Sequence, residues 1–392
     1  MDITWLLKPG ELVLKGDNRK LFEHYLQRNI QRMLKADGKV IKFKATTGRY
    51  YITAPEEQSE FVENALSRLI GISGWARTIV CEKTPDAVFA ACLEEGNKIA
   101  GGGAKTFKIE ARRTDKSFPM SSYEICCKCG EIIYNKYGLA VKINNPDNTI
   151  RIEIREKALV YSGGQKGLGG LPVGTAGKGL LLLSGGIDSP VAGFLMAARG
   201  MSINAIHFHS YPFTSNEAKQ KTIDLAKTIS SYCMGLNLYI LNFTKVQMKI
   251  KEKSPASWAT VLLRMAMMEA AEKTAQKIKC KCLITGESLS QVASQTIENL
   301  GCTQNRIKLP VVRPLIGMNK ENIIKEAMRI GTYDISIQPY EDCCTLFTPK
   351  HPVLYGKIEE ANRLYEELEL ETLIDESIEN LELKSMDYKT IL

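Results

Sequence analysis

The sequence lacks any long uninterrupted hydrophobic run. No apolar stretch in the 392 residues approaches the length of about 18 residues that a membrane-spanning helix requires, and Met1-Asp2-Ile3-Thr4 does not begin a signal peptide. We therefore expect no membrane association and a cytoplasmic location. In a reducing compartment, the 11 cysteines would be available as thiols and would not be committed to structural disulfides.

Some ligand-binding signatures are also missing. The Walker pattern G-x-x-x-x-G-K-[ST] does not occur, because Gly177-Lys178-Gly179 lacks the following Ser or Thr. Histidine is scarce, with four in the chain, and the pair His207 and His209 has no evident third ligand. We expect no metal site built from protein ligands, apart from Mg²⁺ that would accompany a nucleotide.

Charge is unevenly distributed along the chain. The net charge is +8, and residues 1–178 account for the whole excess because residues 179–392 hold equal numbers of basic and acidic side chains. Residues 359–392 are strongly acidic, so the rest of the C-terminal half is basic as well. This distribution favours a polyanionic partner, although a moderate positive charge is also common on plain soluble proteins.

The most informative stretch lies near the middle of the chain. Leu180–Leu183 predicts a strand buried on both faces of a parallel sheet, and Ser184–Ser189 predicts a tight turn before a helix that starts at Pro190. Such a turn binds anions through backbone N–H groups and the helix dipole. The two serine hydroxyls add donors, and Asp188 would hold Mg²⁺ or orient a nucleotide. An ordinary strand–turn–helix made of small residues is the alternative interpretation.

Two mixed α/β modules are expected before this turn. Residues 1–83 follow the order βαββαβ, which is typical of a ferredoxin-like module. Residues 84–166 predict two helices and three strands, and Ser121 with Glu124 forms a capping box at the second helix. The expected elements are 3–7, 18–35, 40–44, 49–54, 55–70, 74–82, 86–100, 106–112, 121–137, 149–155 and 158–162.

A charged loop follows the strand at residues 106–112. Arg112, Arg113 and Lys116 could grip phosphates, and Phe118 could stack on a terminal base of RNA. The alternative is a solvated charged loop. Between residues 163 and 179, eight glycines predict a join between two halves of the chain, either a flexible linker or a more specific connection.

From residue 179 onwards, strands and helices alternate as in a doubly wound parallel sheet, in which ligands bind at the carboxyl ends of strands. His207 and Phe208 end one strand, where backbone groups could read adenine while the Phe208 ring packs on it. Arg264 is either a phosphate contact or a surface arginine with a buried stem. Gly286 follows another strand, and Gln295 is expected near the nucleotide. The expected elements are 180–183, 203–209, 217–233, 238–243, 257–276 and 282–285.

Two catalytic candidates come later in the chain. Lys320 stands beside a helix start and could neutralise charge that develops on a pyrophosphate leaving group. The neighbours Cys343 and Cys344 cannot readily bridge each other, which argues against a structural disulfide. A loop thiol beside Lys350 and His351 could have a lowered pKa and act as a nucleophile, whereas two buried cysteines are the alternative.

Several stretches resemble one enzyme family. Ser184–Ser189 resembles the S-G-G-x-D-S pyrophosphate loop (PP-loop) of ATP pyrophosphatases, and residues 107–118 look like the core of an RNA-binding THUMP domain. With residues 169–179, Gly286–Thr296 and Glu341–Cys344, the chain is similar to the tRNA 4-thiouridine synthetase (tRNA sulfurtransferase) family over essentially all its length. The implied α/β domains are ferredoxin-like (1–83), THUMP (84–166), a glycine-rich linker (167–178) and a PP-loop ATP pyrophosphatase domain with an acidic helical tail (179–392).

The resemblance also implies an activity. ATP would adenylate O4 of uridine at tRNA position 8, and persulfide sulfur on Cys344 would displace the activated oxygen, with Asp188 and Lys320 serving activation. ATP and Mg²⁺ are the implied cofactors, and tRNA, a cysteine desulfurase and a second copy of the chain are the implied partners. The family also takes part in making the thiazole of thiamine. The implied ATP-site residues are Leu182, Leu183, Ser184, Gly185, Gly186, Asp188, Ser189, His207, Phe208, Arg264, Gly286 and Gln295.

Two other functions are compatible with these residues: a different adenylating PP-loop ligase, and a non-catalytic tRNA-binding protein. The second is less favoured because every residue of the PP-loop pattern is retained. Some relatives carry a rhodanese domain, which we do not expect here because the sequence stops at Leu392. A desulfurase would then deliver sulfur directly, and Cys343 would be the candidate resolving thiol.

Overall fold

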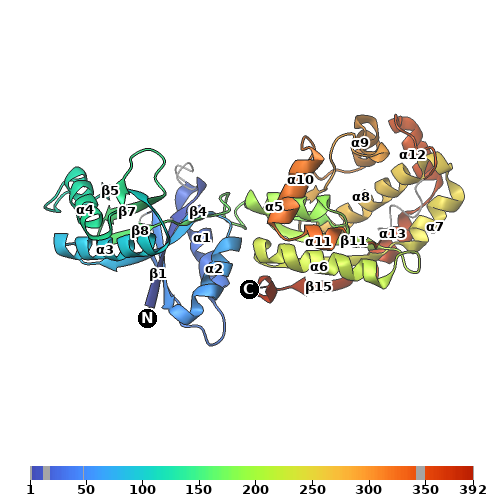
Figure 1. Ribbon diagram of the computed structural model, residues 1–392. Helices are drawn as coiled ribbons and strands as arrows, with labels where there is room; N and C mark the ends of the chain where they lie inside the picture. Colours follow the sequence, from blue (N-terminus) through green and yellow to red (C-terminus); the bar gives the residue numbers. More distant parts are fainter. Residues whose placement is uncertain (1, 12–17, 47, 341–348, 392) are drawn as a thin grey trace. The chain divides into compact units, whose positions relative to one another are not determined.

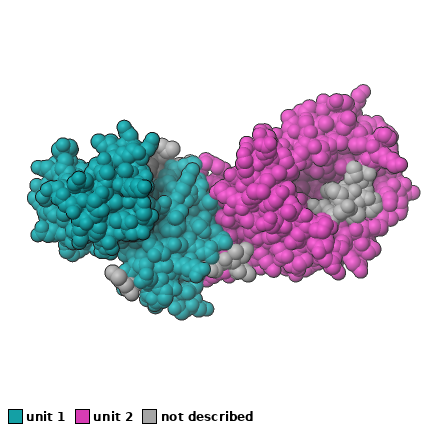
Figure 2. All heavy atoms as spheres, viewed as in Figure 1, with its two compact units in different colours: residues 1–170 teal, residues 171–392 magenta. Residues whose placement is uncertain are grey.

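A computed structural model describes residues 2–11, 18–46, 48–340 and 349–391 (Figure 1). The chain divides into two compact units, residues 1–170 and 171–392, which we call the N-terminal and C-terminal units (Figure 2). Within the described ranges, no helix is long and apolar enough to cross a membrane. This agrees with the expectation from the hydropathy of the sequence.

The first half of the N-terminal unit has the predicted βαββαβ order. Buried and partly exposed residues alternate along β3, and the two helices each bury one apolar stripe. The elements are β1 (Asp2–Pro9), α1 (Arg19–Leu34), β2 (Lys42–Thr46), β3 (Arg49–Pro55), α2 (Ser59–Arg68) and β4 (Ile72–Cys81).

The second half of the N-terminal unit adds two helices and further strands. The predicted capping box begins α4: the Glu124 N–H donates to Ser121 Oγ at 3.2 Å, and the Ser121 N–H donates to Glu124 Oε2 at 2.6 Å. Two short strands, β6 and β9, were not predicted. The elements are α3 (Pro85–Gly101), β5 (Thr106–Arg113), α4 (Ser122–Tyr137), β6 (Ala140–Val141), β7 (Asn148–Ile154), β8 (Ala158–Ser162) and β9 (Gln165–Lys166).

Both halves share one sheet. Among the described residues its strand order is β2-β3-β1-β4-β8-β7-β5-β6, with β9 paired to β4, so β4 joins the two modules by pairing with β1 and β8. The helices lie on one face: Trp5 of β1 donates to Glu63 of α2, and the apolar side chains of α3 and α4 pack on Ile109 and Ile152. Because strand side chains alternate, the opposite face is left without a helix from the described part of this unit.

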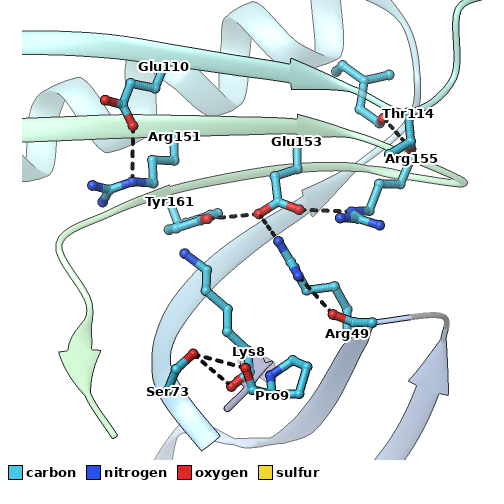
Figure 3. A network of polar contacts seen from close by, with 12 residues as sticks. Lys8, Pro9, Arg49, Ser73, Glu110, Thr114, Arg151, Glu153, Arg155 and Tyr161 are labelled. Carbon is cyan, nitrogen blue, oxygen red and sulfur yellow. Dashed lines mark hydrogen bonds and ion pairs between the residues drawn. The ribbon is translucent and has the colours of Figure 1, made fainter. Parts of the chain in front are cut away.

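A buried ion-pair network on this open face links the two modules (Figure 3). Glu153 of β7 accepts hydrogen bonds from Arg49 Nη2 of β3 at 3.1 Å, Arg155 Nε at 2.8 Å and the Tyr161 hydroxyl at 3.0 Å. Its side chain is 7% exposed. Burial by itself would raise the pKa of Glu153, but the two arginines and the hydrogen bonds outweigh burial and lower it.

The Glu153→Gln variant tests how much this network stabilises the fold. Removing one partner of a buried ion pair should lower the free energy of unfolding by about 3–5 kcal/mol at neutral pH. Because the folded-state pKa of Glu153 lies below its ordinary value of 4.5, the folded state binds fewer protons than the unfolded state. The stabilisation is therefore present above that value and is lost as the pH falls through the lowered pKa.

Urea unfolding of wild type and variant measures this effect. The difference in the free energy of unfolding should be full at neutral pH and should shrink below about pH 4. Glu156→Gln is the matched control, because that exposed carboxylate lies 3.9 Å from Lys44 and should contribute little. Equal stability of Glu153→Gln and wild type at neutral pH would contradict the prediction.

The glycine-rich join is hydrogen-bonded on both sides of residue 170. In the N-terminal unit, the N–H groups of Gly167 and Gly169 donate to Ser73 and Ile72 carbonyls at 3.0 and 2.8 Å. A Cβ on Gly167 would lie 2.3 Å from the Ile72 oxygen, so only glycine permits this approach. In the C-terminal unit, the Leu171 N–H donates to a carbonyl at the end of α5, at 2.9 Å. These residues are thus hydrogen-bonded within the unit to which each belongs.

The C-terminal unit is the predicted α/β unit with a mainly parallel sheet. The described strands follow the order β14-β13-β10-β11-β12-β15, and only β15 runs antiparallel, against β12. The acidic tail contains two helices, as expected, but it also supplies this edge strand, which a 3₁₀ helix (Tyr388–Ile391) follows. The elements are β10 (Lys178–Leu182), α5 (Asp188–Ala198), β11 (Ser202–His209), α6 (Asn216–Cys233), β12 (Leu236–Asn242), α7 (Thr244–Lys253), α8 (Ala259–Lys277), β13 (Cys282–Ile284), α9 (Ile297–Gln304), β14 (Val311–Val312), α10 (Lys320–Arg329), α11 (Tyr333–Ser336), α12 (Ile358–Glu367), α13 (Glu371–Glu379) and β15 (Glu382–Met386).

The leucine strand β10 is covered on both faces. Leu180 belongs to the core formed with α8, whereas Leu181 lies against α5, where a Cβ on Gly193 would approach its Cδ2 to 2.7 Å. Both leucines are fully buried. Helix α5 begins at Asp188 and not at Pro190 as predicted, so the Asp188 carboxylate belongs to the first helical turn. This start brings the helix N-terminus close to the end of β10.

Candidate active site and nucleic-acid interface

A cavity of about 230 Å³ opens at the carboxyl ends of β10, β11 and β13. The structure brings together eleven of the twelve residues expected around ATP, and the twelfth, Gly185, lies in the same turn. Thr285, Glu287 and two methionines also line the cavity and were missed. The lining residues are Leu182, Leu183, Ser184, Gly186, Asp188, Ser189, His207, Phe208, Arg264, Met267, Met268, Thr285, Gly286, Glu287 and Gln295.

The turn between β10 and α5 is held by its two serines. The Ser184 N–H donates to Ser189 Oγ at 2.9 Å, the Gly186 N–H donates to Ser184 Oγ at 3.2 Å, and the two hydroxyl oxygens are 3.2 Å apart. These bonds fix the turn against the N-terminus of an 11-residue helix. The positive end of the helix dipole favours an anion at this point.

Asp188 and Lys320 meet at the mouth of this turn. Lys320 Nζ lies 2.6 Å from Asp188 Oδ1, and Gln291 Nε2 donates to Asp188 Oδ2 at 2.9 Å. Mg²⁺ commonly takes one or two carboxylates and completes its shell with substrate phosphates, and Asp188 fits that role. No group of three or more metal-ligating side chains exists in the described ranges, so Mg²⁺ here would depend on nucleotide phosphates.

Gly286 provides the closest approach in the site. A Cβ at this position would lie 2.7 Å from the Ser189 nitrogen, 2.8 Å from the Ser189 Cα and 2.9 Å from the Asp188 carbonyl carbon. These are backbone atoms of the first turn of α5, which cannot move aside as the end of a flexible side chain can. The end of β13 and the start of α5 therefore pack without any room for a side chain.

The side of the cavity formed by Phe208 and Gln295 is apolar with a few polar groups. Phe208 is buried and packs edge-on against Phe243, with ring centroids 4.8 Å apart. Gln295 is 8% exposed and lines the cavity, and its Oε1 has no hydrogen-bond partner in the described part of the chain. A buried oxygen without a partner fits a ligand that donates a hydrogen bond, as a ribose hydroxyl or an adenine amine does.

Both histidines of the pair His207 and His209 contact protein groups through Nδ1. Burial and the neighbouring His207 lower the pKa of His209 to about 4, and its Nδ1 lies 3.0 Å from Thr214 Oγ1. His207 Nδ1 lies 3.0 Å from the Leu183 carbonyl oxygen. His207 thus contacts the chain just after β10, and His209 contacts the loop between β11 and α6.

The RNA-binding residues expected in the N-terminal unit are not equally available. Arg112 and Lys116 are exposed, whereas Arg113 is half-buried and donates from Nη1 to the Phe118 carbonyl at 3.1 Å. Phe118 is 3% exposed and packs in the core beneath α3 and α4. The hypothesis that Phe118 stacks on an RNA base is wrong for this conformation, because the loop turns its ring inward.

The open sheet face carries six basic groups besides the predicted Arg112. Two hollows of about 520 and 130 Å³ lie on it, and seven of their lining residues are cationic against three carboxylates. Lys8 Nζ lies 4.9 Å from the centroid of the Tyr161 ring, and burial is the main cause of its lowered pKa. The cations are Lys8, Lys44, Arg49, Arg112, Arg151, Arg155 and Lys157.

Family models match the chain in three consecutive segments: the ThiI ferredoxin-like domain at residues 4–76, the THUMP domain at 82–162 and the thiamine biosynthesis protein (ThiI) model at 174–370. A probable tRNA sulfurtransferase of Treponema pallidum (strain Nichols) is 47% identical over 376 residues, or 95% of this chain and 93% of that protein. A probable tRNA sulfurtransferase of Caldanaerobacter subterraneus subsp. tengcongensis is 45% identical, covering 94% and 96%. The chain belongs to the ThiI family of tRNA sulfurtransferases.

Solved structures agree with this family. The crystal structure of a 4-thiouridine synthetase–RNA complex with bound ATP has a TM-score of 0.91 and 34% identity, and covers 98% of this chain and 100% of that chain. PH1313 from Pyrococcus horikoshii Ot3 has a TM-score of 0.66 and 25% identity, covering 84% and 99%. The predicted combination of a ferredoxin-like domain, a THUMP domain and a PP-loop domain in a tRNA-thiolating enzyme is confirmed.

In this ThiI-family chain, the candidate sulfur carriers Cys343 and Cys344 lie outside the described residues. The segments on either side are anchored to the C-terminal unit. Lys221 of α6 is 6% exposed and donates from Nζ to the carbonyls of Gln338 and Tyr340 at 2.9 and 3.3 Å. On the other side, Asn299 Nδ2 of α9 donates to the Val353 carbonyl at 2.8 Å.

The buried cysteines of the described ranges are poor alternatives as sulfur carriers. All are free thiols, and burial raises the pKa of Cys233 to about 12 and that of Cys282 to about 11, which disfavours the reactive thiolate. Cys126 and Cys129 have C-x-x-C spacing on α4, but Cys129 is buried in the core, and no third cysteine completes a cluster site in the described ranges.

Substituting Gly286 with alanine should displace the first turn of α5 while leaving the rest of the fold intact. A misplacement of about 1 Å in such a site can reduce activity roughly 100-fold, and we expect a comparable loss of ATP-dependent turnover together with weaker ATP binding. Calorimetric titration with ATP-Mg and a circular-dichroism check of folding would measure both.

Gly317→Ala is the matched control for this variant. Nothing lies within 4 Å of a Cβ added at Gly317, so ATP binding should be unchanged there. A folded Gly286→Ala variant that binds ATP as tightly as wild type would contradict the proposed importance of this close contact.

Proposed function

We propose that this protein uses ATP to adenylate O4 of uridine 8 in tRNA and then replaces that oxygen with persulfide sulfur, giving 4-thiouridine. The observation that carries the proposal is the serine–glycine turn at the start of α5, with Asp188 and Lys320 2.6 Å apart at its mouth. The relatives called tRNA sulfurtransferase and the ATP-bound 4-thiouridine synthetase–RNA complex support it. We propose the domain boundaries that the sequence predicts: a ferredoxin-like domain to residue 83, a THUMP domain to residue 166, a linker to residue 178 and a PP-loop domain after it.

In the first step, the backbone N–H groups of the turn hold the triphosphate of ATP. Uridine O4 attacks the α-phosphorus, a new O–P bond forms, and the bond to pyrophosphate breaks. Lys320 neutralises the negative charge that grows on the departing pyrophosphate, and Asp188 keeps the lysine ammonium in place. Mg²⁺ bound between Asp188 and the phosphates would supply further charge neutralisation.

In the second step, the terminal sulfur of a persulfide on Cys344 attacks C4 of the adenylated base, and AMP leaves with O4. A second thiol, for which Cys343 is the candidate, then attacks Sγ of Cys344, forms a disulfide with it and leaves the outer sulfur on C4. A disulfide between adjacent cysteines would be strained, which favours its reduction by an external thiol that restores both cysteines. We propose that a cysteine desulfurase supplies the persulfide in the cytoplasm, and that the same sulfur can serve thiamine thiazole synthesis.

We further propose that the open sheet face and the Arg112–Lys116 loop hold the acceptor end of tRNA. Seven cations on one helix-free surface, Arg112 among them, suit a phosphate backbone, and the exposed side chain of Lys116 adds an eighth in the adjoining loop. A homodimer would let one RNA contact two copies of the chain, and light scattering of the active enzyme tests that state.

Asp188→Ala and Cys344→Ser should each reduce 4-thiouridine formation by at least about 1,000-fold, because each removes a group needed in a chemical step. The measurement is nucleoside mass spectrometry after reaction of the protein with tRNA, ATP-Mg and a persulfide source. Asp224→Ala and Cys127→Ser, at exposed positions away from the cavity, are matched controls. Full activity of both test variants would contradict this mechanism. Pyrophosphate release that is equal with and without tRNA would instead indicate another adenylating ligase.

Arg112→Gln and Lys116→Gln should weaken tRNA binding without changing ATP affinity. Each lost phosphate contact lowers the magnitude of the slope of log affinity against log salt by roughly 0.7–0.9. Lys98→Gln is the control, since Lys98 is exposed on α3, on the helix-covered face. Filter binding at several salt concentrations would measure the slopes. An unchanged slope in both test variants would show that this loop makes no phosphate contact.

A further inference from the structure

The cavity contains a buried carboxylate that has no part in the steps above. Glu287 lies just after β13, and its side chain is 4% exposed. Its Oε1 accepts a hydrogen bond from Arg264 Nη2 of α8, and its Oε2 accepts from Arg313 Nε at 2.6 Å and from Thr285 Oγ1 at 2.8 Å. Two arginines that are distant in sequence thus meet on one carboxylate at the cavity wall.

We propose that Glu287 is a positioning residue for ATP binding, which holds the Arg264 guanidinium in the orientation that receives the nucleotide. This inference rests on the proposed function, because it assumes that the cavity takes ATP. Arg264 and Glu287 both line the cavity, whereas Arg313 binds Glu287 Oε2 and is not one of the lining residues. Glu287 acts through Arg264 because both of its oxygens already accept hydrogen bonds from protein donors.

The charges of this cluster explain why a carboxylate is tolerated beside a phosphate site. Burial would raise the pKa of Glu287, but Arg264 and Arg313 outweigh it and lower the pKa, so the group is ionised at neutral pH. One carboxylate between two guanidinium groups leaves a net positive charge that suits an anion. Without Glu287, the two arginines would repel each other, and Arg264 would lose a charged hydrogen-bond acceptor.

Glu287→Gln separates positioning from simple electrostatics, because the two effects have opposite signs. Removing a negative charge makes the cavity more positive and would by itself tighten ATP binding. Loss of the fixed Arg264 orientation should weaken ATP binding. A hydrogen bond to a charged group corresponds to roughly a 10- to 100-fold change in affinity for ATP. We expect that weakening, with KM for ATP rising by a similar factor and kcat at saturating ATP changing less.

The experiment is calorimetric titration of the full-length chain with ATP-Mg, together with steady-state thiolation of tRNA over a range of ATP concentrations. Glu269→Gln is the matched control: Glu269 lies on the same helix as Arg264 but accepts from Tyr365 at 3.0 Å, away from the cavity. In Arg264→Gln, adding Glu287→Gln should cause little further loss, because the two residues act as one unit.

Unchanged or tighter ATP binding by folded Glu287→Gln would overturn the inference, as would losses that simply add in the double variant. If Glu287→Gln does not fold, Arg313→Gln decides, because it removes the support of Glu287 while the carboxylate keeps Arg264 and Thr285. It should weaken ATP binding by a smaller factor, about 3- to 10-fold, and unchanged binding would overturn the inference. Wild-type protein that fails to bind ATP would instead refute the proposed function.

Discussion

The close packing of the end of β13 against the start of α5 is the constraint on which the site depends. Gly286 meets backbone atoms of Asp188 and Ser189, and no side chain fits between them. This contact aims the N-terminus of α5 at the cavity and holds the Asp188 carboxylate within reach of Lys320. The covered leucine strand β10 supplies the rigid floor, since its residues are packed on both faces of the sheet.

Charge in the cavity is paired before any nucleotide is present. Lys320 lies against Asp188, and Arg264 and Arg313 lie against Glu287. Paired cations keep fixed positions and avoid mutual repulsion, so little reorganisation is needed when phosphates arrive. The chain on either side of the two candidate cysteines is also held in place. Helix α6 binds residues 338–340 and helix α9 binds Val353 through hydrogen bonds to backbone carbonyls.

The two units use β-sheets in different ways. The sheet of the C-terminal unit is covered on both faces, so its cavity lies at the ends of the strands, as is usual for parallel sheets. The sheet of the N-terminal unit has its helices on one face and a basic surface on the other. The Arg49–Glu153 pair joins the two modules across that surface, so the basic groups belong to one continuous sheet.

The sequence by itself determined the family, most of the elements up to β13 and most of the cavity lining, because those features follow from local patterns: the leucine run, the Ser184–Ser189 turn and the capping box at Ser121. It did not determine which distant side chains meet. The contacts of Glu287 depend on tertiary structure, because they come from the end of β13, from α8 and from the segment after β14. The Phe118 ring is buried because its loop turns inward, and the charge pattern of the sequence does not encode that turn. Lys8, Arg49 and Arg151 form one surface only because strand pairing brings their alternating positions together, and such long-range register depends on tertiary packing.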